Sequence, residues 1–346
     1  MNLALVSSPR FAAHTPPAGH AECPERAEVM DVVAAEWRAR GARLVVPESA
    51  GRDLLVRVHA SAYLDRLADT AGHARRLDPD TFTSPESWEI AQLAAGAAVL
   101  ATRLVLEGQV SRAAALVRPP GHHALPDRAM GFCLINNVAV AAADAIARGV
   151  RRVAIVDIDV HHGNGTQAVF EADPRVLYVS THQWPCYPGT GAAAETGRGA
   201  AEGFTVNVPL PPGCTDVEYA LAFERVVLPV LHTFQPDLLF VSAGFDAHEL
   251  DPLAHMRVSE AGFDAMTRRL AAVADACCDG RMVLVTEGGY DLAAFAGSLH
   301  AALGAMVGAA PAVPRDVASA DTDTSARARR MIDEARAIQA RYWPGL

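Results

Sequence analysis

The chain has 346 residues and contains no apolar run that approaches the ~20 residues needed to span a membrane. Residues 1–10 also lack the charged start and the long apolar core of a signal peptide, and they predict a first strand instead. We therefore expect a protein that has no membrane-spanning segment and that resides in the cytoplasm.

Cysteine is scarce and shows no pairing pattern. The six cysteines include no C-x-x-C pair, and six in 346 residues do not make a disulfide scaffold. The sequence therefore favours reduced thiols and gives no support for a cysteine zinc site. The cysteines are Cys23, Cys133, Cys186, Cys214, Cys277 and Cys278.

Positive charge is in deficit and is not clustered. Lysine and arginine together number 30 against 40 aspartates and glutamates, which gives a formal net charge of −10. Without a basic tract, direct binding to nucleic acid is not expected. The negative field weakly favours cationic substrates.

Strand-like and helix-like segments alternate along most of the chain, which predicts an α/β fold with a largely parallel sheet covered by helices, in one domain spanning residues 1–346. Several expected strands are continuous apolar runs, typical of strands buried on both faces. The expected strands are Leu3–Val6, Leu44–Val46, Ala113–Val117, Val153–Val156, Val176–Val179, Leu238–Val241 and Met282–Val285. The expected helices are Glu25–Arg40, Tyr63–Ala71, Pro85–Leu106, Asn137–Arg148, Val217–Phe234, Glu260–Cys277, Leu292–Val307 and a peripheral C-terminal helix at about 325–340, and the expected long loop is Thr190–Gly203.

The most informative segment is Asp157-Ile-Asp-Val-His-His-Gly-Asn-Gly165, which follows the apolar run Val153–Val156 at once. Buried charges are costly unless they are paired or bind a metal. Alternation along a strand would place Asp157, Asp159 and His161 on one side, where they offer oxygen and nitrogen donors to a metal ion. An aspartate at a strand end can also simply cap the next helix, so the motif alone leaves both interpretations open.

Polar clusters follow four other expected strands as well, and ligands of open α/β sheets bind outside the carboxyl ends of the strands. Five such clusters predict convergence on one cleft. Besides the segment after Val153–Val156, they are Arg118-Pro-Pro-Gly-His-His123, Ser180-Thr-His182, Ser242-Ala-Gly-Phe-Asp-Ala-His248 and Thr286-Glu-Gly-Gly-Tyr290.

Chemical roles can be assigned to these residues. Asp159, His161 and Asp246 could form a three-ligand catalytic zinc site with open positions for water and substrate. The remaining candidates are His122 or His123 as general base and acid, Asp157 and Asn164 as partners that orient the imidazoles, and Tyr290 as donor to an oxyanion. Each has a structural alternative: a surface His-His loop, a helix-capping Asp246, a Gly-Gly-Tyr turn, and wall or structural roles for His182 and His248.

These motifs resemble the histone deacetylase family, in the form found in its class II and bacterial members. The resemblance covers about Arg10 to Gly308 and implies a three-layer αβα fold of the arginase and deacetylase type. The segments that carry it are His20–Arg26, Arg118–Ala124, Gly131–Asn137, Asp157–Thr166, Gly244–Pro252 and Glu287–Tyr290.

The resemblance implies one Zn²⁺ ion per chain on Asp159, His161 and Asp246. It implies that His123 is the general base and acid, held by Asn164 where class I members carry Asp, and that His122 gives electrostatic support and is held by Asp157. It also implies that Tyr290 polarises the scissile carbonyl. A K⁺ or Na⁺ ion is implied near the carbonyls of Asp157, Asp159, His161, Ser180 and Thr181.

The resemblance also implies a substrate tunnel. Phe132, after Gly131, would be one wall, and Tyr187 would stand where the opposite Phe lies in the family. Arg26 would line the inner acetate pocket, and Asp78 or Asp80 would be the rim carboxylate that grips substrate backbone. Leu253 follows Asp251-Pro252 where glutamate-gated polyamine enzymes carry Glu, which favours acetyl-lysine enzymes.

The expected reaction is therefore hydrolysis of an N-acyl amide of a lysine peptide or a small acylated amine, with an acetylpolyamine amidohydrolase as the alternative and with homo-oligomerisation left open. A dinuclear manganese ureohydrolase is disfavoured because Gly163 and His248 stand where its bridging carboxylates would be. A non-catalytic acyl-lysine binding module is disfavoured because no base, ligand or tyrosine of the motifs is lost.

Overall fold

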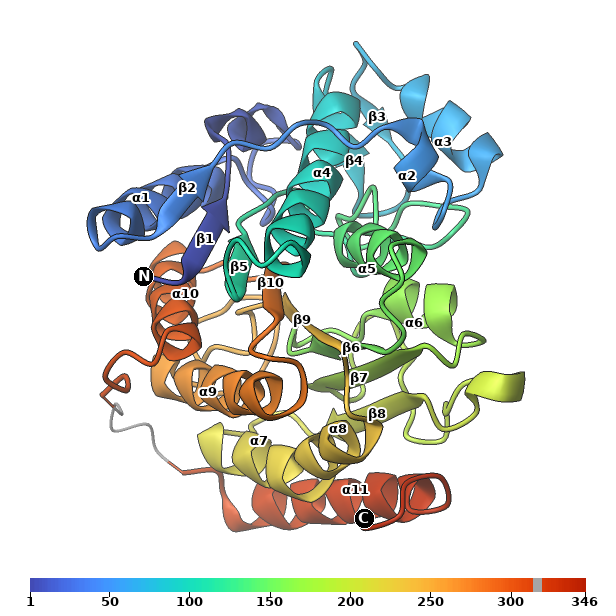
Figure 1. The fold of residues 1–346 in the computed structure, drawn as a ribbon, viewed down its shortest axis with the longest axis vertical. Coiled ribbons are helices and arrows are strands. Elements are labelled where there is room, and N and C mark those ends of the chain that lie inside the picture. The colour runs from blue at the N-terminus through green and yellow to red at the C-terminus, as the bar shows by residue number, and fades with distance from the viewer. Residues whose placement is uncertain (314–318) are drawn as a thin grey trace. The chain divides into compact units, whose positions relative to one another are not determined.

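The computed structural model describes residues 1–313 and 319–346 (Figure 1). The chain separates into two compact units whose sequence ranges interleave. The first unit contains Met1–Val150, Asn164–Val169 and Val283–Gly288, and the second contains Arg151–Gly163, Phe170–Met282 and Gly289–Leu346. The single domain expected from the sequence remains a prediction.

Buried strands form the core of the first unit. Their order is β2 (Arg43–Val45), β1 (Leu3–Val6), β5 (Arg112–Ala115) and β10 (Met282–Thr286), and β1 pairs in parallel with both β2 and β5. Every residue of β1, β5 and β10 is buried, which accounts for their mainly apolar composition.

Three helices pack on this core. Helix α1 (Glu25–Ala39) contacts β2, whereas α4 (Ser87–Leu106) contacts β1, β5 and α5 (Asn137–Ala147). Helix α1 begins directly after Pro24 and is followed by Gly41, whose φ of +98° suits the turn that ends a helix.

Helix α4 corrects one expectation from the sequence. It has 20 residues and is long and apolar enough to cross a membrane by length and composition, although no apolar run was expected to approach that length. Of its most apolar 18-residue stretch, 72% is buried. Its alanine-rich composition is therefore explained by its place in the core of the first unit.

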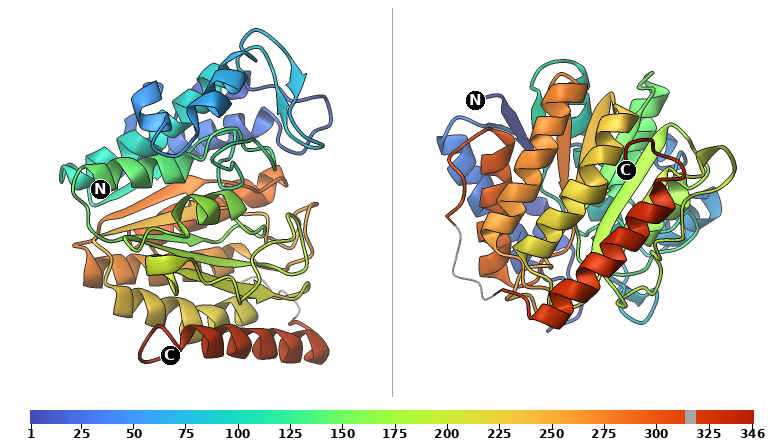
Figure 2. Two further views of the ribbon diagram at one scale, coloured as in Figure 1. Left: turned by 90° about the vertical axis from the view of Figure 1, so that its right-hand side faces the viewer. Right: turned by 90° about the horizontal axis from the view of Figure 1, so that it is seen from below.

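Parallel strands also form the core of the second unit. Their order is β9 (Leu238–Ala243), β6 (Val153–Asp157), β7 (Val176–Gln183) and β8 (Thr205–Leu210), and all three pairings are parallel. Helix α9 (Glu260–Cys277) contacts α7 (Asp216–Ala222), α8 (Leu228–Phe234) and α10 (Leu292–Met306). Helix α11 (Thr322–Gln339), red in Figure 2, lies along β8 and α7.

One expected helix is divided. The sequence predicted a single helix at Val217–Phe234, but a π-helical turn at Phe223–Val227 separates α7 from α8. Pro229 lies at the start of α8 and cannot donate the backbone hydrogen bond of a regular helix, so a change of helical type is expected there.

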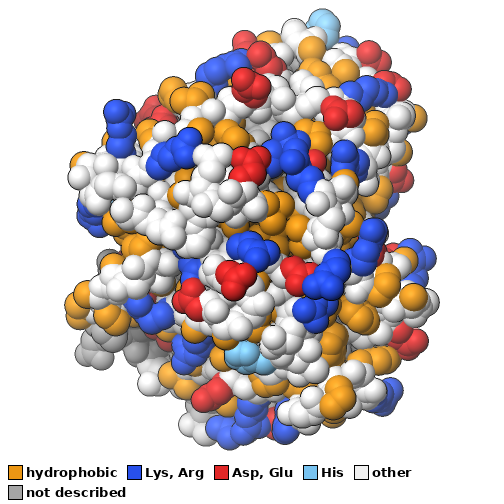
Figure 3. Space-filling view, viewed as in Figure 1, with side chains coloured by type: hydrophobic (Ala, Val, Ile, Leu, Met, Phe, Trp, Pro, Cys, Tyr) orange, Lys and Arg blue, Asp and Glu red, His pale blue; other side chains and the backbone are white. Residues whose placement is uncertain are grey.

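The α/β class and the mostly parallel arrangement of the strands are confirmed, and every expected strand is present with ends that differ by at most four residues from those predicted. The sequence did not predict β8 or the short elements α2 (Arg52–Leu55), β3 (Arg75–Arg76), β4 (Phe82–Thr83), α6 (Asn164–Phe170), η1 (Pro9–Ala13) and η2 (Gly199–Ala201). The expected helix at Tyr63–Ala71 is α3 (Ser61–Ala68). On the face drawn in Figure 3 the described acidic and basic side chains are interspersed.

Candidate active site

The register of two parallel strands in the second unit positions a cluster of possible metal ligands. Asp157, the last residue of β6, lies opposite Ser242 of the neighbouring strand β9. The segments that follow these strands therefore leave the same edge, and they bring Asp159, His161 and Asp246 together. One ligand atom from each lies within 4.8 Å of the others.

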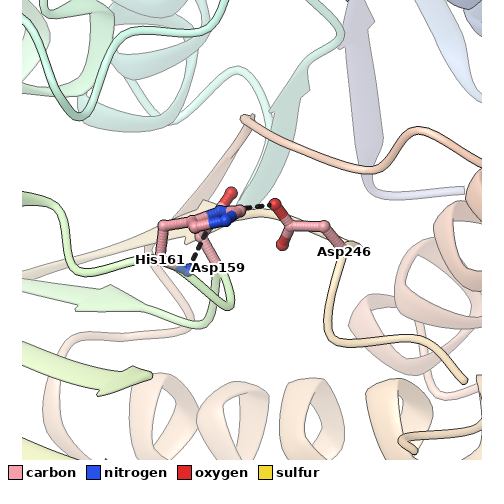
Figure 4. Close-up of side chains that lie close together, drawn as sticks. All are labelled: Asp159, His161 and Asp246. Carbon is pink, nitrogen blue, oxygen red and sulfur yellow. Dashed lines mark hydrogen bonds and ion pairs between the residues drawn. The ribbon is translucent and has the colours of Figure 1, made fainter. Parts of the chain in front are cut away.

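The three side chains face one another directly (Figure 4). The Nδ1 atom of His161 lies 3.2 Å from Oδ1 of Asp159 and 3.0 Å from Oδ2 of Asp246. Both aspartates are fully buried, and only 8% of His161 is exposed. The predicted metal ligands thus form one compact donor set of two carboxylates and an imidazole.

The electrostatics of the cluster reflect two carboxylates buried side by side. Burial raises the pKa of Asp246, and the nearby Asp159 carboxylate raises it further. Burial alone would lower the pKa of His161, but its hydrogen bonds with Asp159 and Asp246 outweigh burial and raise that pKa well above its ordinary value. A positive charge at this position is therefore strongly favoured.

Backbone hydrogen bonds and a glycine fix the geometry of the cluster. The His161 N–H donates to Oδ1 of Asp159 over 2.8 Å, and the Val160 N–H donates to Oδ1 of Asp246 over 2.9 Å. A Cβ atom at Gly244 would lie 2.0 Å from Oδ2 of Asp159. Only glycine at position 244 leaves room for the Asp159 carboxylate.

The alternation argument for Asp157 was wrong, because β6 ends at that residue and the chain bends afterwards. Asp157 is not a member of the donor set, and its Oδ2 accepts a hydrogen bond from the Tyr178 hydroxyl over 3.1 Å. The expected support of His122 by Asp157 remains a prediction.

The cluster Ser180-Thr-His182 does not follow a strand as expected, because it lies inside β7. His182 is fully buried and bonds to the Ser180 hydroxyl and the Gly191 carbonyl, each over 2.9 Å. His248 accepts the Leu250 N–H over 3.1 Å. These contacts favour structural roles for both histidines.

In the first unit, His123 is paired with Asn164 as expected from the sequence. The Nδ1 atom of His123 lies 2.8 Å from Oδ1 of Asn164, and the Asn164 amide nitrogen lies 3.3 Å from the sulfur of Met130. Gly131 has a φ of +57°, and a Cβ atom there would lie 2.5 Å from the His123 ring. The His123 ring is therefore held by the side-chain amide of Asn164 on one side and by the backbone of Gly131 on another.

The loop that carries the two histidines is held by Glu287. This fully buried carboxylate accepts the N–H groups of Gly121 and His122 over 2.6 and 3.1 Å. The rings of His122 and His123 lie 4.0 Å apart between centroids. The motif that ends in Tyr290 therefore contributes a positioning carboxylate that the sequence analysis did not assign.

A second buried carboxylate, Glu22, was also missed. It binds Arg118 in a bidentate manner over 2.7 and 2.9 Å and Arg26 over 3.2 Å, and all three side chains are fully buried. Burial would raise the pKa of Glu22, but Arg118 and His14 outweigh it and lower that pKa far below its ordinary value. Arg118 lies in a proline-rich loop, and a buried arginine needs an anion nearby because an unpaired buried charge is costly. Its position could therefore have indicated the buried carboxylate from the sequence.

The predicted substrate residues of the first unit lie close together. The Phe132 N–H donates to the Thr81 hydroxyl over 3.0 Å, and its ring packs 4.6 Å from that of His20, whose Nε2 lies 3.0 Å from the Asp80 carbonyl. Asp78 binds the backbone of the turn, whereas Asp80 is half-buried. Arg26 donates to the Glu287 carbonyl.

Asp251 links the predicted substrate and catalytic residues of the second unit. Its two carboxylate oxygens accept the Leu253 N–H over 3.0 Å and the Tyr290 N–H over 2.7 Å. Burial, followed by repulsion from Asp246, raises the pKa of Asp251 to about 7. The Tyr187 ring lies 6.2 Å from that of His161.

Comparisons with known proteins identify the family. The histone deacetylase domain model matches residues 20–306, so the chain belongs to the histone deacetylase family. The histone deacetylase-like amidohydrolase of Pseudomonas aeruginosa is 46% identical over 284 residues, which are 79% of this chain and 73% of that protein. A protein of Archaeoglobus fulgidus named "Probable deacetylase" is 40% identical over 291 residues, which are 83% of this chain and 81% of that protein.

The fold agrees with this assignment. The crystal structure of the HDA15 HD domain has a TM-score of 0.89 and 36% sequence identity, and the match covers 99% of this chain and 97% of that one. The chain therefore has the mostly parallel α/β fold of the arginase and deacetylase type, and it is an amidohydrolase of the deacetylase class.

Proposed function

We propose that the protein is a zinc-dependent deacetylase that hydrolyses the N-acyl amide of a lysine side chain or of a similar amine. The observation that carries the proposal is the buried donor set of Asp159, His161 and Asp246 in a member of this family. The alternative, an acetylpolyamine amidohydrolase, uses the same chemistry on a smaller substrate.

The donor set suits one zinc ion. Zinc takes nitrogen and carboxylate-oxygen ligands, and catalytic sites keep three protein ligands and an open position. The raised pKa values of Asp246 and His161 indicate that the cluster favours a positive charge, which a metal ion supplies. Among the described residues no further carboxylate belongs to the group, which disfavours a dinuclear site.

His123 is proposed as the proton carrier. Because Oδ1 of Asn164 can only accept, Nδ1 of His123 carries the proton of their hydrogen bond, and Nε2 is left with a lone pair. Nε2 would take a proton from the attacking water and later give it to the leaving amine. Bound zinc would polarise the acyl carbonyl and make water easier to deprotonate.

Tyr290 is proposed to donate its phenol proton in a hydrogen bond to the oxyanion that forms from the carbonyl. Asp251 fixes the backbone of Tyr290, and His122 would add electrostatic support, with Asp157 as its partner. The proposed substrate contacts are Phe132, Gly131, Asp80 and Arg26 in the first unit and Tyr187 and Leu253 in the second.

Further properties of the protein are proposed as well. A K⁺ or Na⁺ ion would bind near Asp157 and Ser180, where the buried Thr181 hydroxyl has no hydrogen-bond partner among the described residues. None of the six cysteines forms a disulfide in the described part of the chain, which supports the proposal of a reducing, cytoplasmic location. It remains a prediction that the protein acts without binding nucleic acid or a membrane. A homo-oligomeric state also remains a prediction.

The decisive experiment measures acetate release from an acetyl-lysine peptide, acetylputrescine and acetylspermidine, with the metal content determined before and after chelation. We expect one metal ion per chain, turnover of at least one substrate, and loss of turnover on chelation that added Zn²⁺ restores. Full activity after complete metal removal would refute the proposal. Bound metal with no turnover of any acyl amide would instead support a binding module.

A further inference from the structure

A pocket with a volume of about 340 Å³ lies in the first unit, and none of the residues proposed above for proton transfer or metal binding lines it. It is lined by α3 and by the two loops around residues 77–78 and 128–130. Its volume is at the lower end of the range for ligand pockets, so it has room for one large side chain rather than for a cofactor.

Part of the pocket lining is apolar. Leu67 and Tyr63 of α3 are buried, and the Tyr63 hydroxyl donates to the Leu134 carbonyl, which leaves its ring in the wall. Leu77 also lines the pocket and is 37% exposed. An exposed leucine beside buried apolar side chains favours an apolar group as the occupant.

Two arginines, Arg66 and Arg128, also line the pocket. Arg66 lies 5.8 Å above the centroid of the Tyr63 ring and donates to the carbonyls of Asp127 and Ala62 over 2.9 and 3.1 Å. Arg128 lies on the opposite loop, 3.2 Å from the Asp127 carboxylate. As throughout this chain, the cations are arginines, because the sequence contains no lysine.

The charges around the pocket nearly cancel. Asp78 lines the pocket together with Arg66 and Arg128, and Asp127 neutralises Arg128. Neither a carboxylate nor an amine would therefore gain much there. A flat aromatic ring would gain most, since guanidinium groups stack on aromatic faces and Met130, which also lines the pocket, is a side chain that packs well against rings.

The pocket adjoins the proposed substrate and proton-transfer residues within the same unit. Met130 lines the pocket, contacts Asn164 through its sulfur over 3.3 Å and precedes Gly131, which lies against His123. Asp78 lies two residues before Asp80, the proposed rim carboxylate. Met130 and Gly131 therefore connect the pocket to the residues proposed to receive the acyl-lysine.

We propose that the pocket binds an aromatic side chain of a peptide substrate, close in sequence to the acylated lysine. This inference rests on the proposed deacetylase function and narrows its substrate class. A free acylated polyamine has no aromatic group to place there, so the pocket selects acyl-lysine within a polypeptide.

The test uses acetyl-lysine peptides of one length in which Phe, Leu, Glu or Ala is placed in turn at each position within two residues of the lysine. We expect kcat/KM for the best Phe peptide to exceed that of its Ala counterpart by about tenfold, mainly through KM. Leu should give a smaller gain and Glu none. Equal values for Phe and Ala at every position would overturn the proposal, as would a preference for Glu equal to that for Phe.

Two variants locate the effect. Arg128→Gln and Leu77→Ser should lose most of the preference for Phe and keep the activity on the Ala peptide, whereas the surface controls Arg151→Gln and Val217→Ser should keep both. Preference for Phe that survives in both pocket variants would overturn the assignment to this pocket.

Calorimetric binding of the same peptides to the metal-loaded protein separates this inference from the proposed function. Binding that favours Phe and requires Arg128, without any turnover, would uphold the pocket and refute the deacetylase. Turnover without any difference between peptides would uphold the deacetylase and refute the pocket.

Discussion

The two units balance their buried charges in different ways. In the first unit, Glu22 binds the buried Arg118 and Arg26, and Glu287 binds backbone N–H groups and lies next to Arg26 through its carbonyl. In the second unit, Asp159 and Asp246 share a single imidazole, that of His161. In the first unit, side chains of the chain itself neutralise the buried carboxylate of Glu22. In the second unit, two buried carboxylates share one imidazole, so that cluster is suited to binding an added cation.

The largest expected effect tests the second unit. Asp159→Ala removes one of the three proposed metal donors, so it should abolish stoichiometric metal binding and lower kcat/KM by more than the ~10³-fold that loss of an oxyanion donor costs. Metal analysis and acetate release measure the two effects. Asp333→Ala, a change in the exposed Asp333 of α11, is the control and should alter neither.

A stability measurement tests the first unit. Glu22→Gln leaves two buried guanidinium groups without their carboxylate and should lower the free energy of unfolding by about 3–5 kcal/mol in urea titrations at pH 7. The depressed pKa of Glu22 means that the native chain should lose this stabilisation as the pH falls below the ordinary range of glutamate. Glu334→Gln, at an exposed site, should have no such effect, and an equal loss in both variants would contradict the network.

Tyr290→Phe should separate chemistry from metal binding. Loss of one oxyanion donor should lower kcat by ~10²–10³ while the metal content stays at the native value. Near-native kcat in this variant would refute the role of Tyr290. The half-buried Tyr342, whose hydroxyl donates to Glu202 over 2.9 Å, provides the matched Tyr342→Phe control.

His59, a buried histidine of the first unit, predicts that the free energy of unfolding depends on pH, whether or not a metal is bound. Burial lowers the pKa of His59 to about 4, and the neutral ring accepts the Asn136 N–H over 3.0 Å and bonds to the Leu125 carbonyl. The unfolded chain takes up the proton first, so stability should fall by about 3 kcal/mol as the pH falls from ~6.5 to ~4. His59→Gln should flatten this part of the stability curve, and the exposed-site variant His73→Gln should retain it.

The smallest effect concerns the neutral partner of His123. Asn164→Ala should lower kcat/KM by roughly 10–100-fold through loss of ring orientation. Asn164→Asp should restore the hydrogen bond, raise the pKa of His123 by adding a negative charge and move the acidic limb of the pH–rate profile to higher pH. A profile identical to the native one would show that position 164 does not act through His123.

The sequence predicted those parts of the site that lie in contiguous motifs at strand ends. Asp159, His161 and Asp246 were identified because two buried strands ended in acidic residues, and the pairing of His123 with Asn164 followed from the family resemblance. Alternation failed at Asp157, because the strand ended there. Glu22, Glu287 and Asp251 were missed because their partners are backbone groups or residues distant in sequence, and β8 was missed because Pro209 and polar residues interrupt its apolar pattern.

The arginine-only cation content of this chain has a consequence for its own regulation. The chain is proposed to remove acyl groups from lysine, yet it carries no lysine side chain, so it offers no such site for lysine acylation, ubiquitination or reductive methylation. Its activity cannot be tuned by the modification that it is proposed to erase. Amine-directed crosslinkers would likewise find no side-chain anchor in it, so a mass-spectrometric survey of acyl-lysine in a reaction mixture would report on the substrate alone.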